Sequence, residues 1–376
     1  MSPLLLCAAI FGAMLALMAL RVPIAAAMFV AGAGGYLAQA GWGPLAAFLN
    51  NQAFARLASY DLSVIPLFIL MGQLATRGGL SRALFAFASA VMARFRGGLA
   101  MAAVLACAAF GAICGSSVAT AATLTSVALP EMRRHGYSDR LATGTLAAGG
   151  TLGILIPPSV PLVIYAILTE QNIAKLFAAA VVPGVLATLG YLVAIALVVR
   201  WQPELAPPAR SDAPAPDAPA PDTQPALGPL LRGVLPIVAI FLVVFGGIYG
   251  GVFTPTEGAA VGAAATGLAA ALRGELSWTG VRDAFLETAG PCAMIFLIFI
   301  GADLMNSALA LTQVPNQLAA VVGSWGLSPL MVVSAILLFY VVLGAVMDEL
   351  SMILLTIPIF FPMVMGLDFG MPKESV

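Results

Sequence analysis

The sequence predicts an all-α, polytopic membrane protein built from two inverted repeats. Three features lead to this prediction: the composition, a series of long apolar runs, and interruptions at matching places in the two halves of the chain. Of the 376 residues, 61% are hydrophobic and only 9% are charged, whereas a soluble domain carries about 25% charged residues. A soluble core cannot hide so much apolar surface, so lipid must surround much of the chain.

Other features of the composition exclude several classes of protein. The net charge of −1 gives no sign of a nucleic-acid partner. The four cysteines lie in apolar stretches and none forms a CxxC pair, so neither a disulfide framework nor a zinc site is expected. The N-terminus is apolar with no basic start and no small-residue cleavage site, so it is interpreted as a first span, not a removed signal peptide.

The first half of the chain contains apolar runs of two kinds. The uninterrupted runs are residues 3–20, 23–40, 61–76, 83–93 and 175–200, with a weaker run at 44–60 that fits the membrane interface. Two longer runs are interrupted: 97–132 at Cys114–Ser117, and 138–170 between Gly153 and Pro158. An interrupted helix is tolerated in a membrane only where its freed backbone groups face protein or water.

Residues 203–229 divide the chain. This segment is rich in Pro, Ala and Asp and has no apolar face, so we predict an extended, solvated linker. Arg200, Arg210 and Arg232 flank or occupy it and place it in the cytoplasm. The second half contains apolar runs at 232–252, 255–272, 290–311 and 328–366, the last interrupted near Gly344–Ser351.

The charges around residues 97–132 predict a re-entrant hairpin. Basic residues flank both ends, and these residues are Arg94, Arg96, Arg133, Arg134 and Arg140. Because basic residues near spans stay cytoplasmic, both ends lie on one side, with Gly115–Ser117 at the tip. Each arm of about 16 residues measures about 24 Å, short of a ~30 Å hydrocarbon core. The alternative is one long tilted span, against which the arginines argue.

The two halves resemble each other weakly. The segment 65–72 resembles 293–301, and Gly111-Ala-Ile-Cys-Gly-Ser-Ser resembles Gly344-Ala-Val-Met-Asp-Glu-Leu. A proline follows both the Gly111 segment and the Gly344 segment. No Lys or Arg lies between residues 283 and 372, so the hairpin 328–366 has no cytoplasmic marker and is expected to open outward. The alternative is chance likeness among Gly- and Ala-rich strings.

The two interruptions in the first half predict an ion site. Carbonyls at the C-terminal end of a half-helix suit Na⁺, and amides at an N-terminal end suit an anion. Pro157 and Pro158 lack N–H groups and free upstream carbonyls such as those of Gly153 and Ile156, while Ser116 and Ser117 add hydroxyls that suit either ligand. The alternatives are close packing by small residues for Gly-Ser-Ser and a simple kink for Pro-Pro.

Carboxylates in apolar segments are further candidates. Asp348 and Glu349 lie in the second interruption, and Asp303 lies in an apolar span. Asp303 is equally well explained as a residue of a solvated cavity or as a structural partner. Glu257 follows Thr-Pro-Thr at a predicted helix start, where capping is the favoured role. The Arg133–His135 run is interpreted as a solvated turn.

The rival functional classes have weaker support. No GxSxG, HExxH or Walker motif is present, so hydrolysis by this chain is not expected and energy must come from an ion gradient or a partner. A permease driven by a separate ATPase would need a cytoplasmic coupling helix, for which the charged loops are too short. An intramembrane enzyme would need a catalytic pair, and Lys175 has no evident partner.

Five segments resemble one family. They are Gly111-Ala-Ile-Cys-Gly-Ser-Ser-Val-Ala-Thr-Ala-Ala, Leu129-Pro-Glu-Met-Arg-Arg-His-Gly-Tyr, Gly150-Thr-Leu-Gly-Ile-Leu-Ile-Pro-Pro-Ser, Phe253-Thr-Pro-Thr-Glu-Gly-Ala-Ala-Val-Gly and Ile353-Leu-Leu-Thr-Ile-Pro-Ile-Phe-Phe-Pro. Together they resemble the large membrane subunit of tripartite ATP-independent periplasmic (TRAP) transporters, the DctM family, over essentially the whole chain.

This resemblance implies a function and partners. It implies an elevator-type, sodium-coupled importer in the bacterial inner membrane, with Na⁺ as the coupling ion and no other cofactor. The implied partners are a small four-helix membrane subunit and a periplasmic solute-binding protein. The latter delivers an organic acid such as a C4-dicarboxylate, a sialic acid or a related carboxylate. Much of the substrate choice resides in that binding protein.

The resemblance also implies roles for particular residues. The candidate sodium ligands are Cys114, Ser116, Ser117, Gly153, Ile156 and Pro158, mostly through backbone oxygens, with Gly344 and Asp348 at a second site. Ser usually stands where Cys114 stands here, which leaves any hydroxyl role at that position without support. Ser117, Thr120 and Asp303 are the candidate substrate-binding residues.

The resemblance also implies how the chain is divided into a transport domain, a scaffold and a linker. Residues 61–170 and 290–376 would form the two halves of the transport domain, and residues 1–60, 171–200 and 230–289 the scaffold, with 201–229 as linker. The family has a second Gly-x-x-Thr-Pro-Pro interruption after the second hairpin, which this sequence does not reach. We therefore expect a C-terminally truncated member, with an inactive member as the alternative to a working transporter.

Overall fold

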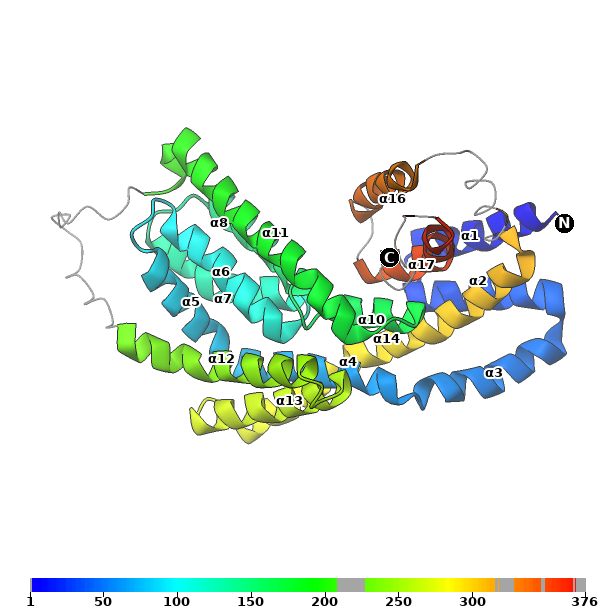
Figure 1. The fold of residues 1–376 in the computed structure, drawn as a ribbon, viewed down its shortest axis with the longest axis horizontal. Coiled ribbons are helices and arrows are strands. Elements are labelled where there is room, and N and C mark those ends of the chain that lie inside the picture. The colour runs from blue at the N-terminus through cyan, green and yellow to red at the C-terminus, as the bar shows by residue number, and fades with distance from the viewer. Residues whose placement is uncertain are drawn as a thin grey trace. The chain divides into compact units, whose positions relative to one another are not determined.

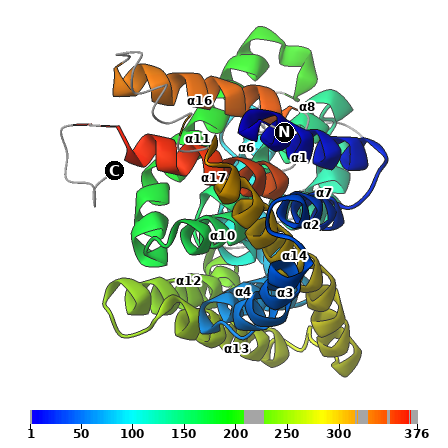
Figure 2. The ribbon, with the colours of Figure 1, turned by 90° about the vertical axis from the view of Figure 1, so that its right-hand side faces the viewer.

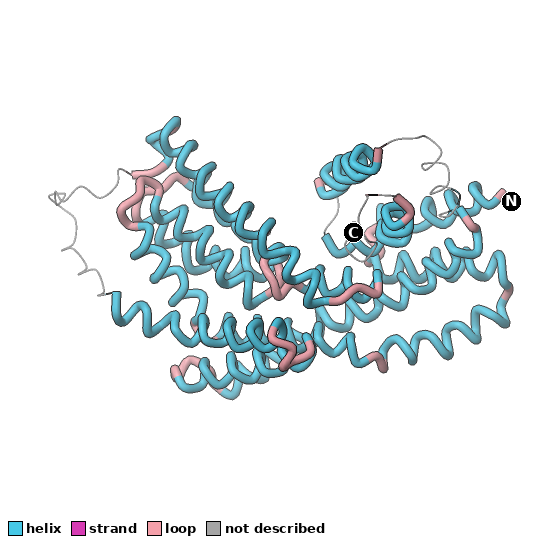
Figure 3. Tube along the Cα trace, viewed as in Figure 1, coloured by secondary structure: helices cyan, strands magenta, loops and turns pink. Residues whose placement is uncertain are grey.

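The computed structural model describes residues 2–207, 227–314, 317, 328–345, 349–367 and 369, and all regular structure in these residues is helical (Figures 1 and 3). The predicted all-α class is therefore confirmed. The chain divides into two compact units, Met1–Tyr60 with Gly290–Val376, and Asp61–Ala289. Contacts within a unit do not show which helices move together. The predicted division into a scaffold and a transport domain therefore stays a prediction.

The unit Asp61–Ala289 contains most of the helices. In chain order its helices are α4 (Val64–Arg77), α5 (Leu80–Met92), α6 (Gly98–Cys114), α7 (Ser117–Arg134), α8 (Asp139–Gly150), α9 (Leu152–Leu155), α10 (Val160–Thr169), α11 (Ile173–Trp201), α12 (Leu227–Tyr249), α13 (Pro255–Leu272) and the first part of α14 (Trp278–Thr312). Short 3₁₀ turns lie at Tyr60–Ser63 (η1) and Pro203–Leu205 (η2).

Helix α6 forms the centre of this unit. Nearly all of its residues are buried, and it packs against α4, α5, α7, α8, α9 and α11. Seven alanines and two glycines make up nine of its 17 residues, and such small side chains let neighbouring backbones approach closely, which is how helices associate in lipid. The helix is therefore surrounded by protein, although it is only 17 residues long.

The outer helices present apolar side chains to their surroundings. On α11 the exposed side chains include Val182, Leu186 and Val193, and on α12 they include Leu235 and Leu242. Exposed rows of this kind are expected where lipid is the solvent. Among the described residues, four helical segments are long and apolar enough to cross a membrane: Asp139–Thr169, Ile173–Trp201, Gly228–Tyr249 and Trp278–Thr312. A bent pair, Trp42–Leu57 with Tyr60–Arg77, would make a fifth.

The other unit joins the two ends of the chain. It contains α1 (Pro3–Ala19), α2 (Ile24–Ala40), α3 (Trp42–Leu57), the second part of α14, α16 (Pro329–Gly344) and α17 (Glu349–Met365). Figure 2 shows these helices from a second direction. Helices α2 and α14 cross at glycines: a Cβ on Gly32 would lie 2.7 Å from the Met305 nitrogen, and one on Gly301 would lie 2.8 Å from the Ala25 carbonyl oxygen. Only glycine permits this approach.

The predicted linker differs from the structure at both of its ends. The start of the predicted linker is ordered, because Pro203–Leu205 forms η2, Ala206 is buried, and the Ser138 N–H donates to the Leu205 carbonyl at 3.0 Å. Its end is helical, since α12 begins at Leu227. The linker between them, residues 208–226, lies outside the described residues. The predicted runs 255–272 and 175–200 agree closely with α13 and α11.

Candidate functional site

The first interruption separates α6 from α7. Helix α6 ends at Cys114, and Gly115 follows with a φ of 63°, which lies in the left-handed region that favours glycine. The Gly115 N–H donates to the Gly111 carbonyl at 2.8 Å. Ser116 then caps α7, its hydroxyl accepting from the Ala119 N–H at 3.4 Å. The glycine thus ends one helix and the serine begins the next.

The second interruption separates α9 from α10. Helix α9 ends at Leu155, Ile156 is extended, and Pro157 and Pro158 are joined by a cis peptide bond. Ser159 is fully buried and caps α10, accepting from the Leu162 N–H at 3.4 Å. Because the two prolines have no N–H, the carbonyls of Gly153 and Ile154, four residues upstream, have lost their helical donors. Ser159 was not among the predicted residues, although a serine one residue before the helix start is a recognisable N-cap signal.

The two interruptions meet directly through main-chain atoms. The Val160 N–H, at the start of α10, donates to the Gly115 carbonyl at 3.2 Å. A Cβ added to Gly115 would lie 2.7 Å from the Pro158 carbonyl oxygen. A Cβ added to Gly153 would lie 2.6 Å from the Thr120 hydroxyl oxygen and 2.8 Å from the Ser116 carbonyl oxygen. The C-terminal ends of α6 and α9 and the N-terminal ends of α7 and α10 therefore converge at one place, which we call the junction.

Further glycines outside the predicted set allow this convergence. A Cβ on Gly111 would lie 2.5 Å from the Gly153 Cα, and one on Gly72 of α4 would lie 2.9 Å from the Cys114 Cα. On the far side, a Cβ on Gly184 of α11 would lie 2.9 Å from the Ile156 side chain. The sequence predicted no contact for Gly72 or Gly111, although their segments belong to the predicted repeat and the Gly111 segment also carries the family resemblance, because the partner of a glycine cannot be read from its own sequence.

The junction contains a buried hydroxyl without a well-aligned partner. Thr120 is fully buried. Its hydroxyl makes no well-aligned hydrogen bond with any described group, although the Cys114 thiol lies beside it. An unpaired buried hydroxyl costs about 1–3 kcal/mol. It faces Gly153, whose carbonyl has lost its donor. Chemically, the junction combines carbonyl oxygens that attract a cation with two helix N-termini that attract an anion.

The other predicted residues lie in the other unit. Asp303 on α14 accepts two hydrogen bonds from Arg56 on α3, each 2.6 Å long, from Nε to Oδ2 and from Nη2 to Oδ1. Arg56 also lies 5.9 Å from the centre of the Phe299 ring. This geometry supports the structural-partner interpretation of Asp303. Arg56 itself was missed, although an arginine within the weaker apolar run 44–60 was a usable signal. Gly344 ends α16, and Asp348 lies outside the described residues.

The carboxylate at Glu257 behaves as predicted. Thr254 caps α13, and its hydroxyl accepts from the Glu257 N–H at 3.2 Å. The Glu257 carboxylate in turn accepts from the Thr254 N–H at 2.8 Å. This reciprocal pair is a capping box, which satisfies two backbone donors at a helix start. The prediction of a capping role is confirmed.

Comparison with known proteins places the chain among permeases. The family model described as "Tripartite ATP-independent periplasmic transporter, DctM component" matches residues 11–371. The C4-dicarboxylate TRAP transporter large permease protein DctM of Pseudomonas aeruginosa is 36% identical over 320 residues, which cover 85% of this chain and 72% of that protein. The sialic acid TRAP transporter large permease protein SiaM of Vibrio cholerae is 29% identical, covering 84% and 71%.

A third relative differs in length. The isethionate TRAP transporter permease protein DctMQ of Oleidesulfovibrio alaskensis is 30% identical over 323 residues, which cover 85% of this chain but only 48% of that protein. The family match spans nearly the whole chain, and the helices described above include segments long and apolar enough to cross a membrane several times. This chain therefore belongs to the DctM family of TRAP transporter large permease subunits, and it is a multi-pass membrane protein.

Proposed function

We propose that this chain imports an organic anion across the bacterial inner membrane and that Na⁺ drives the import. In this proposal a periplasmic solute-binding protein delivers the anion, and a small four-helix membrane subunit completes the permease. The observation that carries the proposal is the convergence of four helix ends at the junction, where Val160 donates to the Gly115 carbonyl. Secondary transporters bind ions and substrates at breaks of this kind.

Sodium is proposed to bind at the carbonyl side of the junction. Its candidate ligands are main-chain oxygens of Cys114, Gly153, Ile156 and Pro158, helped by Ser116 and Ser117. We add the Thr120 hydroxyl, because it is buried, lacks a well-aligned partner and faces Gly153. A cation there would satisfy the hydroxyl and the Gly153 carbonyl, which Pro157 leaves without its helical donor. The ion would be held by partial charges, which favours release as well as binding.

The substrate anion is proposed to bind at the amide side. Helices α7 and α10 both begin at the junction, directly after Ser116 and Ser159, and the N-terminal end of a helix attracts negative charge. The relatives are named for C4-dicarboxylates, sialic acid and isethionate, which carry carboxylate or sulfonate groups. We therefore propose a small organic anion with at least one such group as the substrate.

The decisive experiment removes the Thr120 hydroxyl and measures the concentrations of Na⁺ and of substrate that give half-maximal uptake. The Thr120→Val variant keeps the shape of the side chain but removes the proposed ligand. In liposomes with the binding protein and the small subunit present, the Na⁺ concentration for half-maximal uptake should rise about fivefold, the factor for loss of about 1 kcal/mol. The variant should melt at or above the wild-type temperature, because a buried unpaired hydroxyl is gone.

The matched control is Thr266→Val in α13, whose hydroxyl is also buried and without a partner among the described residues. It should leave the sodium requirement unchanged. If wild-type uptake is the same with and without a Na⁺ gradient, sodium coupling is wrong. If Thr120→Val raises the half-saturating concentration of substrate but not of sodium, Thr120 belongs to the substrate side instead.

A further inference from the structure

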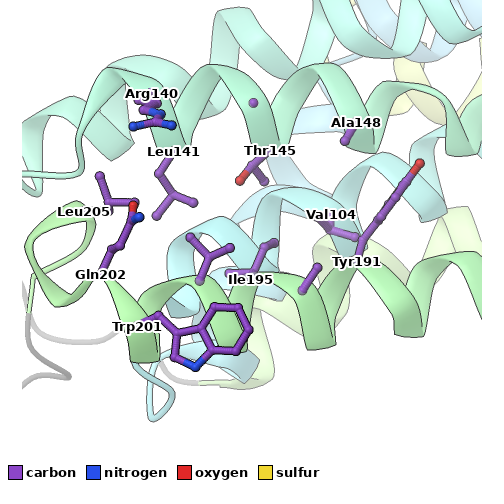
Figure 4. A pocket seen from close by; sticks show the side chains of 13 residues that line it. Val104, Arg140, Leu141, Thr145, Ala148, Tyr191, Ile195, Trp201, Gln202 and Leu205 are labelled. Atoms are coloured by element: carbon purple, nitrogen blue, oxygen red, sulfur yellow. The ribbon is translucent and has the colours of Figure 1, made fainter.

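A concave site lies between α6, α8 and α11, and none of the residues that line it belongs to the junction (Figure 4). Its volume is about 410 Å³, within the range of roughly 300–1,000 Å³ that holds small ligands. The lining comes from α8 between residues 140 and 148, from α11 between residues 191 and 201, from Gln202 just after α11, from Val104 of α6 and from Leu205 of η2. None of these residues takes part in the proposed transport chemistry. We call this site the α8–α11 pocket.

The α8–α11 pocket is long and mostly apolar. Along α11 it extends from Tyr191 to Trp201, which at 1.5 Å per residue is about 15 Å. One leaflet of a bilayer has about the same hydrocarbon depth, half of ~30 Å. Between these ends the wall on α11 is formed by Ala194, Ile195 and Val198. Because other faces of α11 are exposed and apolar, the pocket borders a surface that lipid covers.

The charged side chain that lines the pocket lies at one end of it. Arg140, Gln202 and the exposed ring of Trp201 lie there, and Figure 4 shows Arg140 and Trp201 far from Tyr191. Arg140 has no ion-pair partner among the described residues, whereas the neighbouring Asp139 is paired with Arg133 at 2.7 Å. Tryptophan is enriched where a bilayer meets water, and basic residues mark the cytoplasmic side.

One buried polar group also faces the pocket. Thr145 lines it, only 6% of its surface is exposed, and its hydroxyl has no hydrogen-bond partner among the described residues. Thr145 lies five residues after Arg140 on α8, about 7.5 Å further along the helix. A buried hydroxyl without a partner is costly unless a ligand or water satisfies it. The pocket thus offers a cation at its mouth and a hydroxyl deeper inside.

We propose that the α8–α11 pocket binds an anionic phospholipid of the cytoplasmic leaflet. The lipid phosphate lies against Arg140, beside Trp201, and one acyl chain follows the apolar wall toward Tyr191. The glycerol ester carbonyl, which lies just below the phosphate, accepts the hydrogen bond of Thr145. Basic pockets between spanning helices recognise such headgroups. Basic residues also outnumber acidic ones in the sequence just before α6, around the start of α8 and at the end of α11, which favours an anion. Apart from the Arg133–Asp139 pair, these stretches contain Arg94, Arg96, Arg134 and Arg200 but only Glu131 and Glu204.

The test uses the full chain purified in a neutral detergent. Phosphatidylglycerol, phosphatidylcholine or soluble glycerol 3-phosphate is titrated in, while thermal melting is recorded and lipid adducts are counted by native mass spectrometry. Phosphatidylglycerol should give a retained adduct and a larger rise in melting temperature than phosphatidylcholine. Glycerol 3-phosphate, which lacks an acyl chain, should give neither effect.

Two variants then locate the site. In Arg140→Gln the apparent affinity for phosphatidylglycerol should fall about fivefold, the contribution of one basic residue near an anionic surface. In Gly144→Leu the adduct should be lost, because the added side chain fills the pocket, and a Cβ at Gly144 meets no atom within 4 Å, so folding should be retained. The control Arg134→Gln removes a nearby exposed arginine that does not line the pocket.

Three outcomes would overturn the proposal. The first is a response to phosphatidylglycerol no larger than that to phosphatidylcholine. The second is an equal stabilisation by glycerol 3-phosphate, which would show an anion site without a lipid chain. The third is an equal loss in Arg134→Gln and Arg140→Gln, which would show attraction by surface charge alone. None of these measurements depends on sodium coupling, so they succeed or fail independently of the proposed transport function.

Discussion

The junction and the α3–α14 contact combine polar groups with apolar helices in different ways. At the junction, between residues 114–120 and 153–159, no side chain carries a formal charge, and main-chain groups and hydroxyls supply all the polarity. At the α3–α14 contact, Arg56 and Asp303 meet as a full ion pair with two short hydrogen bonds. In an ion pair of this kind each charged side chain is held by one permanent partner. Partial charges on carbonyls and amides leave a site that can exchange its ligand, which suits transport.

The first prediction removes the glycine at the centre of the junction and should have the largest effect. In Gly115→Ala the new Cβ would lie 2.7 Å from the Pro158 carbonyl oxygen, and the residue would be held at a φ of 63°. Left-handed backbone alone costs about 1–2 kcal/mol for alanine, and the clash with main chain adds to it. Uptake should fall at least about tenfold, because a displacement of about 1 Å in a functional site can lower a rate by more than that.

Gly136→Ala separates the two contributions. Gly136 also has a positive φ, of 76°, but a Cβ there meets no atom within 4 Å. Its variant should lose about 1–2 kcal/mol of stability and keep near-normal uptake per folded molecule. Comparable losses of uptake in the two variants, after correction for folded protein, would contradict the importance of the close approach between Gly115 and Pro158.

The second prediction breaks the ion pair from either side. Arg56→Gln and Asp303→Asn should each lower the free energy of unfolding by about 1–3 kcal/mol, because each leaves a partly buried charge without its partner. The double variant should recover part of that loss, giving a coupling free energy of about 0.5–3 kcal/mol in a double-mutant cycle. Thermal or denaturant unfolding in detergent measures the cycle.

Uptake by the double variant distinguishes the two interpretations of Asp303. If Asp303 is a structural partner, uptake per folded molecule by the double variant should be close to that of the wild type. If Asp303 contacts the substrate or its ion, uptake should remain low even where stability has recovered. The second result would contradict the structural interpretation and show that a charged side chain takes part in transport.

The third prediction concerns the capping pair at the start of α13, which belongs to neither region, and should have the smallest effect. Thr254→Ala removes the hydroxyl that caps α13 and opens the capping box with Glu257. Loss of such a cap costs about 1 kcal/mol. The melting temperature should fall by a few degrees, with uptake and its sodium requirement unchanged. The conservative Thr254→Ser variant should melt close to wild type; a changed sodium requirement in either variant would link this helix start to coupling.

Much of the local structure was predictable because it depends on single residues. Gly115 ends α6 since few other residues adopt a left-handed conformation, and Pro157–Pro158 stops a helix wherever it occurs. The Thr254–Glu257 box was predictable for the same reason, as both partners lie within one turn. The limits of the linker were less predictable, because Ala206 is buried against structure that its own composition does not indicate.

The sequence by itself determined where α6 and α9 are interrupted, that the apolar helices belong in lipid and which family the chain resembles. Only the tertiary structure decided which interruptions meet. Gly115 approaches Pro158, and Gly153 approaches Thr120, because several helices pack where glycine leaves room. It also decided that Arg56 finds Asp303 across 247 residues of chain, and that α6, α8 and α11 enclose a pocket. The physical reason is that helix breaks and caps follow from short-range sterics and hydrogen bonding, whereas partners distant in sequence depend on how whole helices pack.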